Sequence, residues 1–352
     1  MTGALVYDDY KTLYKNKRIQ NLISPNSQIQ PSSVDLSLSD ECYEIKTSFL
    51  SPKTKVRKKL ELIYKKKIDL KYPKIFKKNK TYIVRLNEKL ILNNSTKGHC
   101  NPKSSTGRLN IFCRTILDYC DEYEKIPINY KGEMFLEITT RSFDITFRQG
   151  DKLNQMRLNS NQNVYLNDVE LKKINSINSL ILTNKKNKID NGIKVSVDLS
   201  NDSKVCAYVA KNVKKNIDFS KINFYEFKYY WKALKPLNKS LIIEKDKFYI
   251  LKSREKIRIP NNLAGEMVPY DTGIGDFRAH YAGFFDPGFG EPEGSYAVLE
   301  VKTNEQSFML EDGQTIARIK YEKLNKKTTR VYGYNIKSNY QNQKLALSKH
   351  FK

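Results

Sequence analysis

The segment NPKSSTGRLN, residues 101–110, concentrates groups that can bind a highly charged anion. Two cations, three hydroxyls and a glycine stand in six consecutive positions: Lys103, Ser104, Ser105, Thr106, Gly107 and Arg108. Cations and hydroxyls neutralise and orient phosphate oxygens, and backbone amides near a glycine add further donors. Taken alone, the segment fits a phosphate-binding loop and a polar loop of a lysine-rich protein equally well.

A second concentration of chemistry is YAGFFDPGFGEPEGSYAVLEV, residues 281–301. Pro287 presets φ, and Gly288 and Gly290 tolerate positive φ, so DPGFG predicts a tight turn joining two strands as a hairpin. Asp286 would then lie at the mouth of the turn and could accept a hydrogen bond from a hydroxyl. The alternative is that Asp286 only starts the turn.

Two glutamates lie inside apolar strand segments, Glu137 in MFLEI and Glu300 in AVLEV. Strand alternation by itself would place each on a solvated face. The alternative is a carboxylate in a partly dry pocket, where a raised pKa would let it shuttle protons near neutral pH.

Composition narrows the class of protein. At 352 residues the chain can hold two domains, and its formal charge of +25 suggests nucleic acid. The lysines are spread along the chain, however, as in a product of an AT-rich genome, so nucleic-acid binding is not the favoured function. No apolar run reaches a membrane span and the N-terminus lacks a signal-peptide core, which predicts a soluble, cytoplasmic protein. The five cysteines form no CxxC pair, and with only three histidines a zinc site is not expected; we expect them reduced and buried.

An internal repeat organises the chain. Three pairs of matching residues are each 163 positions apart: Val34 and Val197, Glu137 and Glu300, Gly150 and Gly313. KTYIVRLNEKLIL also echoes KFYILKSREKIRI at an offset of 167. The repeat predicts a tandem duplication with a first domain at 1–165, a connection at 166–190 and a second domain at 191–352.

Each copy has the pattern of β structure. Short runs rich in Ile, Val, Phe, Tyr and Leu alternate with Gly, Asn, Asp and Pro, and RQGDKLNQM and EDGQTIARI each predict a turn entering a strand. Short helices are expected only around residues 8–14 and 224–233. The fold class is therefore mainly β, with two similar barrel-like domains.

NPKSSTGR, FFDPGFG, AVLEV and the tail YGYNIKSNYQNQKLALSKHF together resemble dCTP deaminase, a relative of the dUTPases, in its tandem, double-length bacterial form. The resemblance covers nearly the whole chain and implies two dUTPase-like distorted β-barrels. It implies phosphate ligands at Lys103 (for the family's arginine), Ser104, Ser105 and Arg108. The nucleoside pocket would include Ala282 and Asp286, and the general base would be Glu300 and, in the other copy, Glu137. The tail would close over the triphosphate through Tyr334, Asn335, Tyr340, Asn342 and Gln343.

The two copies depart from the family in complementary ways. The first copy keeps the phosphate motif but reads KIPINYKGE in place of the nucleoside turn, with Asn129 for the aspartate. The second copy keeps the turn but reads PYDTGIGDFR where the serines belong. We therefore expect composite sites that take phosphate ligands from one domain and the nucleoside pocket from another. Arg278 is closer to Ala282 than the family's arginine, so it either replaces that residue or pairs with a nearby carboxylate.

The resemblance implies hydrolysis of dCTP to dUTP and ammonia, supplying dUTP for dUMP and dTTP synthesis. The chain lacks the H-x-E…P-C-x-x-C signature of zinc deaminases, so the reaction would need no zinc. Mg²⁺ would arrive on the substrate triphosphate, and no protein ligands for it are expected. The family also implies a homo-oligomer, and it allows feedback by dTTP, for which the sequence has no signature. A dUTPase, a bifunctional deaminase and dUTPase, and a basic nucleic-acid-binding or regulatory protein on the same fold remain as alternatives.

Overall fold

The computed structural model describes residues 2–160, 162–183, 189–200, 204–269, 277–279, 283–334, 336 and 340–352. The chain is mainly β, as predicted, and it divides into two compact units. Unit 1 comprises Met1–Val164, Val213–Tyr225 and Leu324–Thr329, and unit 2 comprises Tyr165–Asn212, Glu226–Lys323 and Arg330–Lys352. Two short segments from the second half of the sequence therefore fold with unit 1.

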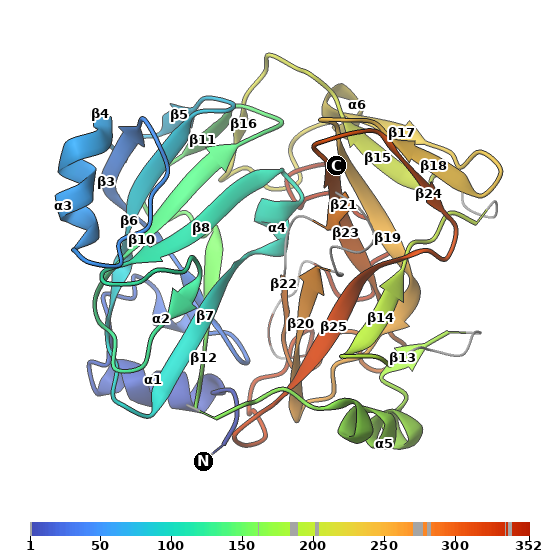
Figure 1. Ribbon diagram of the computed structural model, residues 1–352, viewed down its shortest axis with the longest axis horizontal. Helices are drawn as coiled ribbons and strands as arrows, with labels where there is room; N and C mark the ends of the chain where they lie inside the picture. The colour runs from blue at the N-terminus through green and yellow to red at the C-terminus, as the bar shows by residue number, and fades with distance from the viewer. Residues whose placement is uncertain are drawn as a thin grey trace. The chain divides into compact units, whose positions relative to one another are not determined.

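Unit 1 is built on two main sheets (Figure 1). The larger runs β4-β3-β6-β10-β8, with β1 paired to β6, and the second runs β2-β12-β7-β9. A small third sheet runs β16-β11-β5. The strands are β1 (Ile19–Gln20), β2 (Val34–Leu36), β3 (Leu38–Ile45), β4 (Tyr64–Asp69), β5 (Lys74–Phe76), β6 (Thr81–Ile91), β7 (Thr96–Pro102), β8 (Ile111–Leu117), β9 (Lys125–Ile126), β10 (Lys131–Thr140), β11 (Ile145–Phe147), β12 (Asn154–Ser160) and β16 (Ile217–Asp218).

Unit 2 repeats this order. Its larger sheet runs β17-β15-β19-β23-β21, with β13 paired to β19, and its second sheet runs β14-β25-β20-β22. The two-stranded ribbon of β18 and β24 corresponds to the pair of β5 and β11 in the small third sheet of unit 1. The strands are β13 (Ile181–Leu182), β14 (Ile193–Ser196), β15 (Ala207–Ala210), β17 (Trp231–Leu234), β18 (Ser240–Ile243), β19 (Phe248–Ile257), β20 (Leu263–Pro269), β21 (Phe277–Ala279), β22 (Gly283–Phe285), β23 (Ser295–Thr303), β24 (Phe308–Glu311) and β25 (Thr315–Lys323).

Strand register tests the repeat residue by residue. Glu137 lies opposite Ile83 and Glu300 lies opposite Ile250, so the two glutamates hold equivalent positions. The predicted correspondence of Val34 with Val197 in the repeat is wrong. The amides of Gly150 and Gly313 donate to the carbonyls of Leu38 and Val197, which are 159 positions apart. VDLS is a short motif, and it matched four residues out of register.

The helices are few and short: α1 (Tyr7–Lys15), α2 (Pro25–Gln28), α3 (Val56–Ile63), α4 (Ser104–Gly107), α5 (Asp168–Asn178) and α6 (Phe227–Tyr230). The helix expected around residues 8–14 is confirmed as α1. The one expected around 224–233 shortens to α6, because β17 begins at Trp231. The connection at 166–190 contains α5, which begins with a capping box between Asn167 and Glu170.

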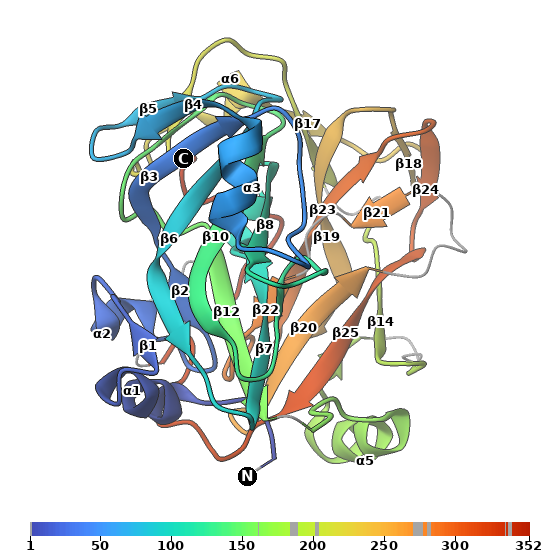
Figure 2. The same ribbon diagram turned by 60° about the vertical axis from the view of Figure 1, so that its left-hand side comes forward.

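Helix α3 covers one face of the larger sheet of unit 1, as Figure 2 shows. Val56 and Leu60 of α3 pack against Ile83 of β6, Ile116 of β8 and Phe135 of β10. Val56 and Leu60 are one helical turn apart, so the helix buries one stripe, while Lys58 remains exposed. No helix in the described part of the chain is both long enough and apolar enough to span a membrane.

The DPGFG segment is a turn, but not the hairpin that we expected. The strand before it, β22, pairs with β20, whereas the strand after it, β23, pairs with β19 and β21 in the other main sheet. Gly288 (φ 95°) and Gly290 (φ 74°) do take the positive φ predicted for them. The turn therefore carries the chain from one sheet of unit 2 to the other.

Candidate functional site

The phosphate motif of unit 1 forms a short turn of helix. Lys103 precedes α4, and its backbone amide donates to the carbonyl of Leu153 (2.9 Å). The hydroxyl of Thr106 is buried and also donates to Leu153 (2.8 Å), so it anchors the loop rather than facing a ligand. Ser104 is exposed, whereas Ser105 and Arg108 are buried. Of the predicted phosphate ligands, Lys103 and Ser104 are therefore the ones that solvent reaches.

Lys103 forms an ion pair with Asp35 of β2, a residue that sequence reasoning did not assign to the site. Asp35 is buried, and its Oδ1 has no hydrogen-bond partner among the described residues. The acidic residue between Val34 and Leu36 in SSVDLS was the available signal. The pair holds the Lys103 ammonium beside the start of α4.

The turn of unit 2 is closely packed. A Cβ added to Gly288 would lie 2.3 Å from Val331 Cγ1, and one added to Gly290 would lie 2.0 Å from the carbonyl oxygen of Ile257. Glycine is thus required at both positions because side chain and backbone press against them. Asp286, half-buried, opens this turn, and its carbonyl accepts from the amide of Phe289 (3.1 Å).

Glu300 lies in β23 between Leu299 and Val301 and is only 6% exposed. The solvated-face alternative is therefore excluded, as it is for Glu137, which is 1% exposed. Arg278 lies in β21 in register with Lys302, and its side chain lies outside the part of the chain that the structure describes. Ala282 and Asn335 lie outside the described residues.

In unit 1, Glu137 already has a cation. Arg114 of β8 lies directly opposite Glu137 of β10, and its Nε and Nη2 both donate to Oε1, at 3.2 and 2.6 Å. The centroids of the Phe112 and Tyr123 rings lie 4.7 and 3.6 Å from the guanidinium carbon of Arg114. Sequence reasoning missed Arg114, although an arginine inside the apolar run IFCRTIL could have raised the question.

The C-terminal tail packs against the turn of unit 2. The backbone amide of Gln343 donates to Ser295 Oγ (3.2 Å), and its side-chain amide donates to the carbonyl of Tyr296 (2.8 Å). The hydroxyl of Tyr340 accepts from the amide of Lys349 (3.2 Å), while the side chain of Tyr334 is 89% exposed. The end of the chain is held as well, since the ring of Phe351 lies 5.5 Å from Tyr230 and 6.0 Å from Trp231.

Burial determines the state of several titratable groups. Burial raises the pKa of Cys42, Cys100 and Cys113 well above the usual value, and it raises that of Cys206 to about 11, so these thiols stay protonated. All five cysteines are buried and free of disulfides, as expected. Burial also raises the pKa of Glu124 to about 7, against the opposing effect of hydrogen bonds from Asn154 and Thr115.

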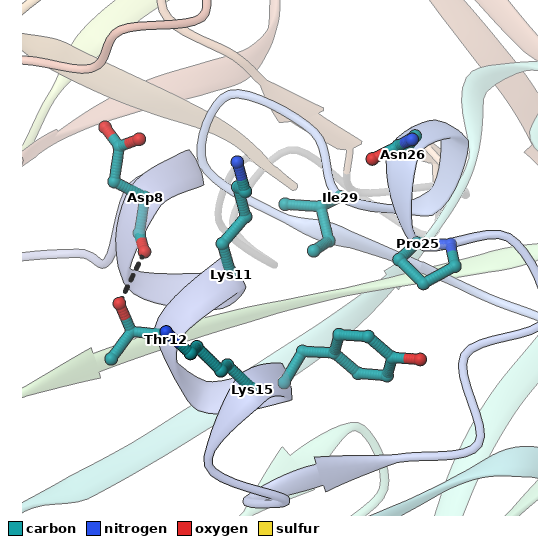
Figure 3. A pocket seen from close by; sticks show the side chains of 8 residues that line it. Asp8, Lys11, Thr12, Lys15, Pro25, Asn26 and Ile29 are labelled. Atoms are coloured by element: carbon teal, nitrogen blue, oxygen red, sulfur yellow. Dashed lines mark hydrogen bonds between the residues drawn. The ribbon is translucent and has the colours of Figure 1, made fainter.

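A pocket of about 630 Å³ lies between α1 and α2 in unit 1 (Figure 3). Thr12 Oγ1 donates to the backbone carbonyl of Asp8 at its edge (3.0 Å). Lys11 and Lys15, which also line it, are exposed. None of the predicted site residues lines this pocket, so it has no part in the candidate site.

The register of β9 and β22 corrects one sequence correspondence. Ile126 lies opposite Gly98 and Phe285 lies opposite Gly265, and these two glycines occupy equivalent strand positions. The residue of the first copy that corresponds to Asp286 is therefore Pro127, one residue after Ile126. Asn129, which the sequence comparison had placed there, lies two residues further on.

Comparison with known proteins covers both halves of the chain. The family described as "2'-deoxycytidine 5'-triphosphate deaminase (DCD) N-terminal domain" matches residues 1–162, and the corresponding C-terminal domain matches residues 167–351. The chain is similar to the crystal structure of 2'-deoxycytidine 5'-triphosphate deaminase from Agrobacterium tumefaciens, with 36% sequence identity and a TM-score of 0.90. That likeness covers 96% of this chain and 99% of the other. No curated relative matches.

Proposed function

Because the chain belongs to the 2'-deoxycytidine 5'-triphosphate deaminase family, we propose that it hydrolyses dCTP to dUTP and ammonia with Glu300 as the general base. The observation that carries the assignment of the base is the burial of Glu300 in β23, in the unit that also holds the turn of Asp286. Burying a carboxylate costs free energy unless it is paired or hydrogen-bonded.

The chemistry needs one group that moves a proton. Water attacks C4 of the cytosine, one of its two protons reaches N3 and the other reaches the 4-amino group, and the C4–N bond breaks to release ammonia. Glu300 would take the proton from the water and deliver it to N3, a role that typically contributes about 100- to 10,000-fold to the rate. Asp286 would accept a hydrogen bond from the sugar, and Arg278 would orient the water or replace the family's arginine.

The triphosphate would be held by unit 1. Lys103 and Arg108 would supply positive charge and Ser104 and Ser105 would supply hydroxyls, although Ser105 and Arg108 are buried. Mg²⁺ would arrive with the substrate and remain bound mainly through phosphate oxygens and water. Since unit 2 lacks this motif and unit 1 lacks the aspartate turn, a working site would need residues of both kinds of unit.

The reaction is proposed to be zinc-independent, because the sequence lacks the H-x-E…P-C-x-x-C signature of the zinc deaminases. The tail residues Tyr334, Tyr340 and Gln343 are proposed to close over the triphosphate. We also propose a tandem duplication, a homo-oligomer, a cytoplasmic location, feedback by dTTP, and a product destined for dUMP and dTTP synthesis.

The experiment is to incubate the purified protein with dCTP and Mg²⁺ while ammonia, dUTP, dUMP and pyrophosphate are followed separately. Ammonia together with dUTP is the expected result. Ammonia together with dUMP would make the enzyme bifunctional, as the dUTPase-like turn at Asp286 allows. Turnover of added dUTP without ammonia from dCTP would contradict the proposal in favour of a dUTPase.

A further inference from the structure

The face of the sheet that carries Glu137 is covered by the chain itself. Ile83, which lies opposite Glu137, belongs to the apolar cluster under α3. The connection from β3 to β4 supplies this cover in unit 1. The equivalent connection of unit 2, between β15 and β17, contributes Val213–Tyr225 to unit 1 instead.

The residue of unit 1 that corresponds to Ala282 in the sequence has a bulky side chain. Because Ile126 corresponds to Phe285, the residue three positions earlier, Tyr123, corresponds to Ala282 in the chain. The ring of Tyr123 lies 3.6 Å from the guanidinium carbon of Arg114, and its hydroxyl donates to the carbonyl of Phe49 in the covering segment (3.3 Å). Tyr123 therefore joins the cover to the Arg114–Glu137 pair.

The guanidinium of Arg114 offers the same kind of hydrogen-bond donors as the edge of a protonated cytosine that would face the glutamate of a deaminase. A cytosine protonated at N3 is a planar cation with two adjacent N–H donors, on N3 and on the C4 amine. Arg114 likewise presents Nε–H and Nη2–H side by side to Glu137 Oε1, at 3.2 and 2.6 Å. Aromatic rings lie against its plane, where a bound base would be stacked.

We propose that Arg114 is an internal mimic of the cytosine ring, which fills the nucleoside pocket of unit 1 permanently and leaves Glu137 a structural carboxylate. This inference rests on the proposed function, in which the equivalent Glu300 meets the cytosine. It means that each chain has one working glutamate rather than two. The buried Glu137 needs the cation, because its Oε2 has no hydrogen-bond partner among the described residues.

The test is chemical rescue of Arg114→Ala by methylguanidinium, a free guanidinium of similar shape. The variant should lose on the order of 5 to 10 °C in Tm, since it leaves a buried carboxylate without its partner. Millimolar methylguanidinium should recover part of the lost Tm. The turnover of dCTP per chain of Arg114→Ala should stay within twofold of the wild type. Arg57→Ala is the matched control. Arg57 pairs with the carboxylates of Glu41 and Glu133 at a more exposed site, so methylguanidinium is not expected to restore the Tm of this variant.

If Arg114→Ala does not fold, Arg114→Lys and Tyr123→Leu provide the same readouts, and they should lower Tm without lowering turnover. A tenfold or greater loss of turnover at unchanged Tm would overturn the inference, because Arg114 would then serve a working site. Absence of rescue in a folded Arg114→Ala protein would also overturn it. A wild-type protein that releases no ammonia from dCTP would defeat the proposed function instead, and the rescue of Tm would still decide whether the pocket is filled.

Discussion

The side chain of Gln341 brackets the turn that begins at Asp286. Its Nε2 donates to the carbonyls of Gly288 (3.2 Å) and Glu291 (3.1 Å), and its Oε1 accepts from the amide of Gly290 (3.2 Å). The amide of Tyr332 adds a bond to the carbonyl of Pro287 (2.8 Å). The tail thus fixes the backbone of the proposed nucleoside turn.

Replacing Gln341 with alanine should therefore loosen the turn. Loss of these hydrogen bonds removes about 1–2 kcal/mol of local stability, so the Gly290 amide should exchange with solvent about tenfold faster in hydrogen-exchange measurements. Gln343→Ala is the control, because its side chain bonds Tyr296 instead. Unchanged exchange at Gly290 in Gln341→Ala would show that glycine packing alone holds the turn.

Glu300→Gln should abolish most of the turnover without unfolding the protein. An amide cannot accept the proton of the attacking water, so kcat for ammonia release should fall by about 100- to 10,000-fold while KM changes little. Glu255→Gln is a matched control in β19. That buried carboxylate accepts from the amide and the hydroxyl of Ser196 (2.9 and 2.6 Å), so its loss should lower Tm rather than kcat. Full activity of Glu300→Gln would remove Glu300 from the mechanism.

Glu124 should make unit 1 less stable as the pH rises. Its pKa is about 7 in the folded protein, against an ordinary value of 4.5, so the folded state binds the proton more tightly than the unfolded state. The resulting stabilisation is fully present below about pH 4.5 and is lost as pH rises through about 7, a change of about 3 kcal/mol. Glu124→Gln should remove this pH dependence and be the more stable form at pH 8 in urea unfolding. If the unfolding free energies of the variant and the wild type change with pH in the same way, the raised pKa assigned to Glu124 is contradicted.

Lys103 and Asp35 should be strongly coupled in stability. Lys103→Ala removes the ion-pair partner of a buried carboxylate and should cost about 1–3 kcal/mol of unfolding free energy. Adding Asp35→Asn should recover part of that loss, because the neutral amide is less costly to bury. A double-mutant cycle of urea unfolding measures the coupling. Strictly additive losses would mean that the pair contributes nothing to the loop.

Local signals in the sequence were sufficient for part of the fold. The turns at Gly150 and Gly313 have φ of 88° and 82° and lead into β12 and β25 as predicted, since a glycine turn and strand alternation are encoded within a few residues. Pairing partners are not local. The DPGFG turn was expected to close a hairpin, yet its flanking strands pair in separate sheets, and no pattern within the turn specifies that.

By itself, the sequence determined the mainly β class, the two equivalent glutamates and the motifs that resemble the deaminase family. These follow from residue types at short spacings and from the internal repeat. Only the tertiary structure decided that both glutamates are buried, that Lys103 pairs with Asp35, and that Arg114 occupies the face of Glu137. Those facts depend on strand register and on which segment covers each sheet, and both are set by contacts between residues far apart in the chain.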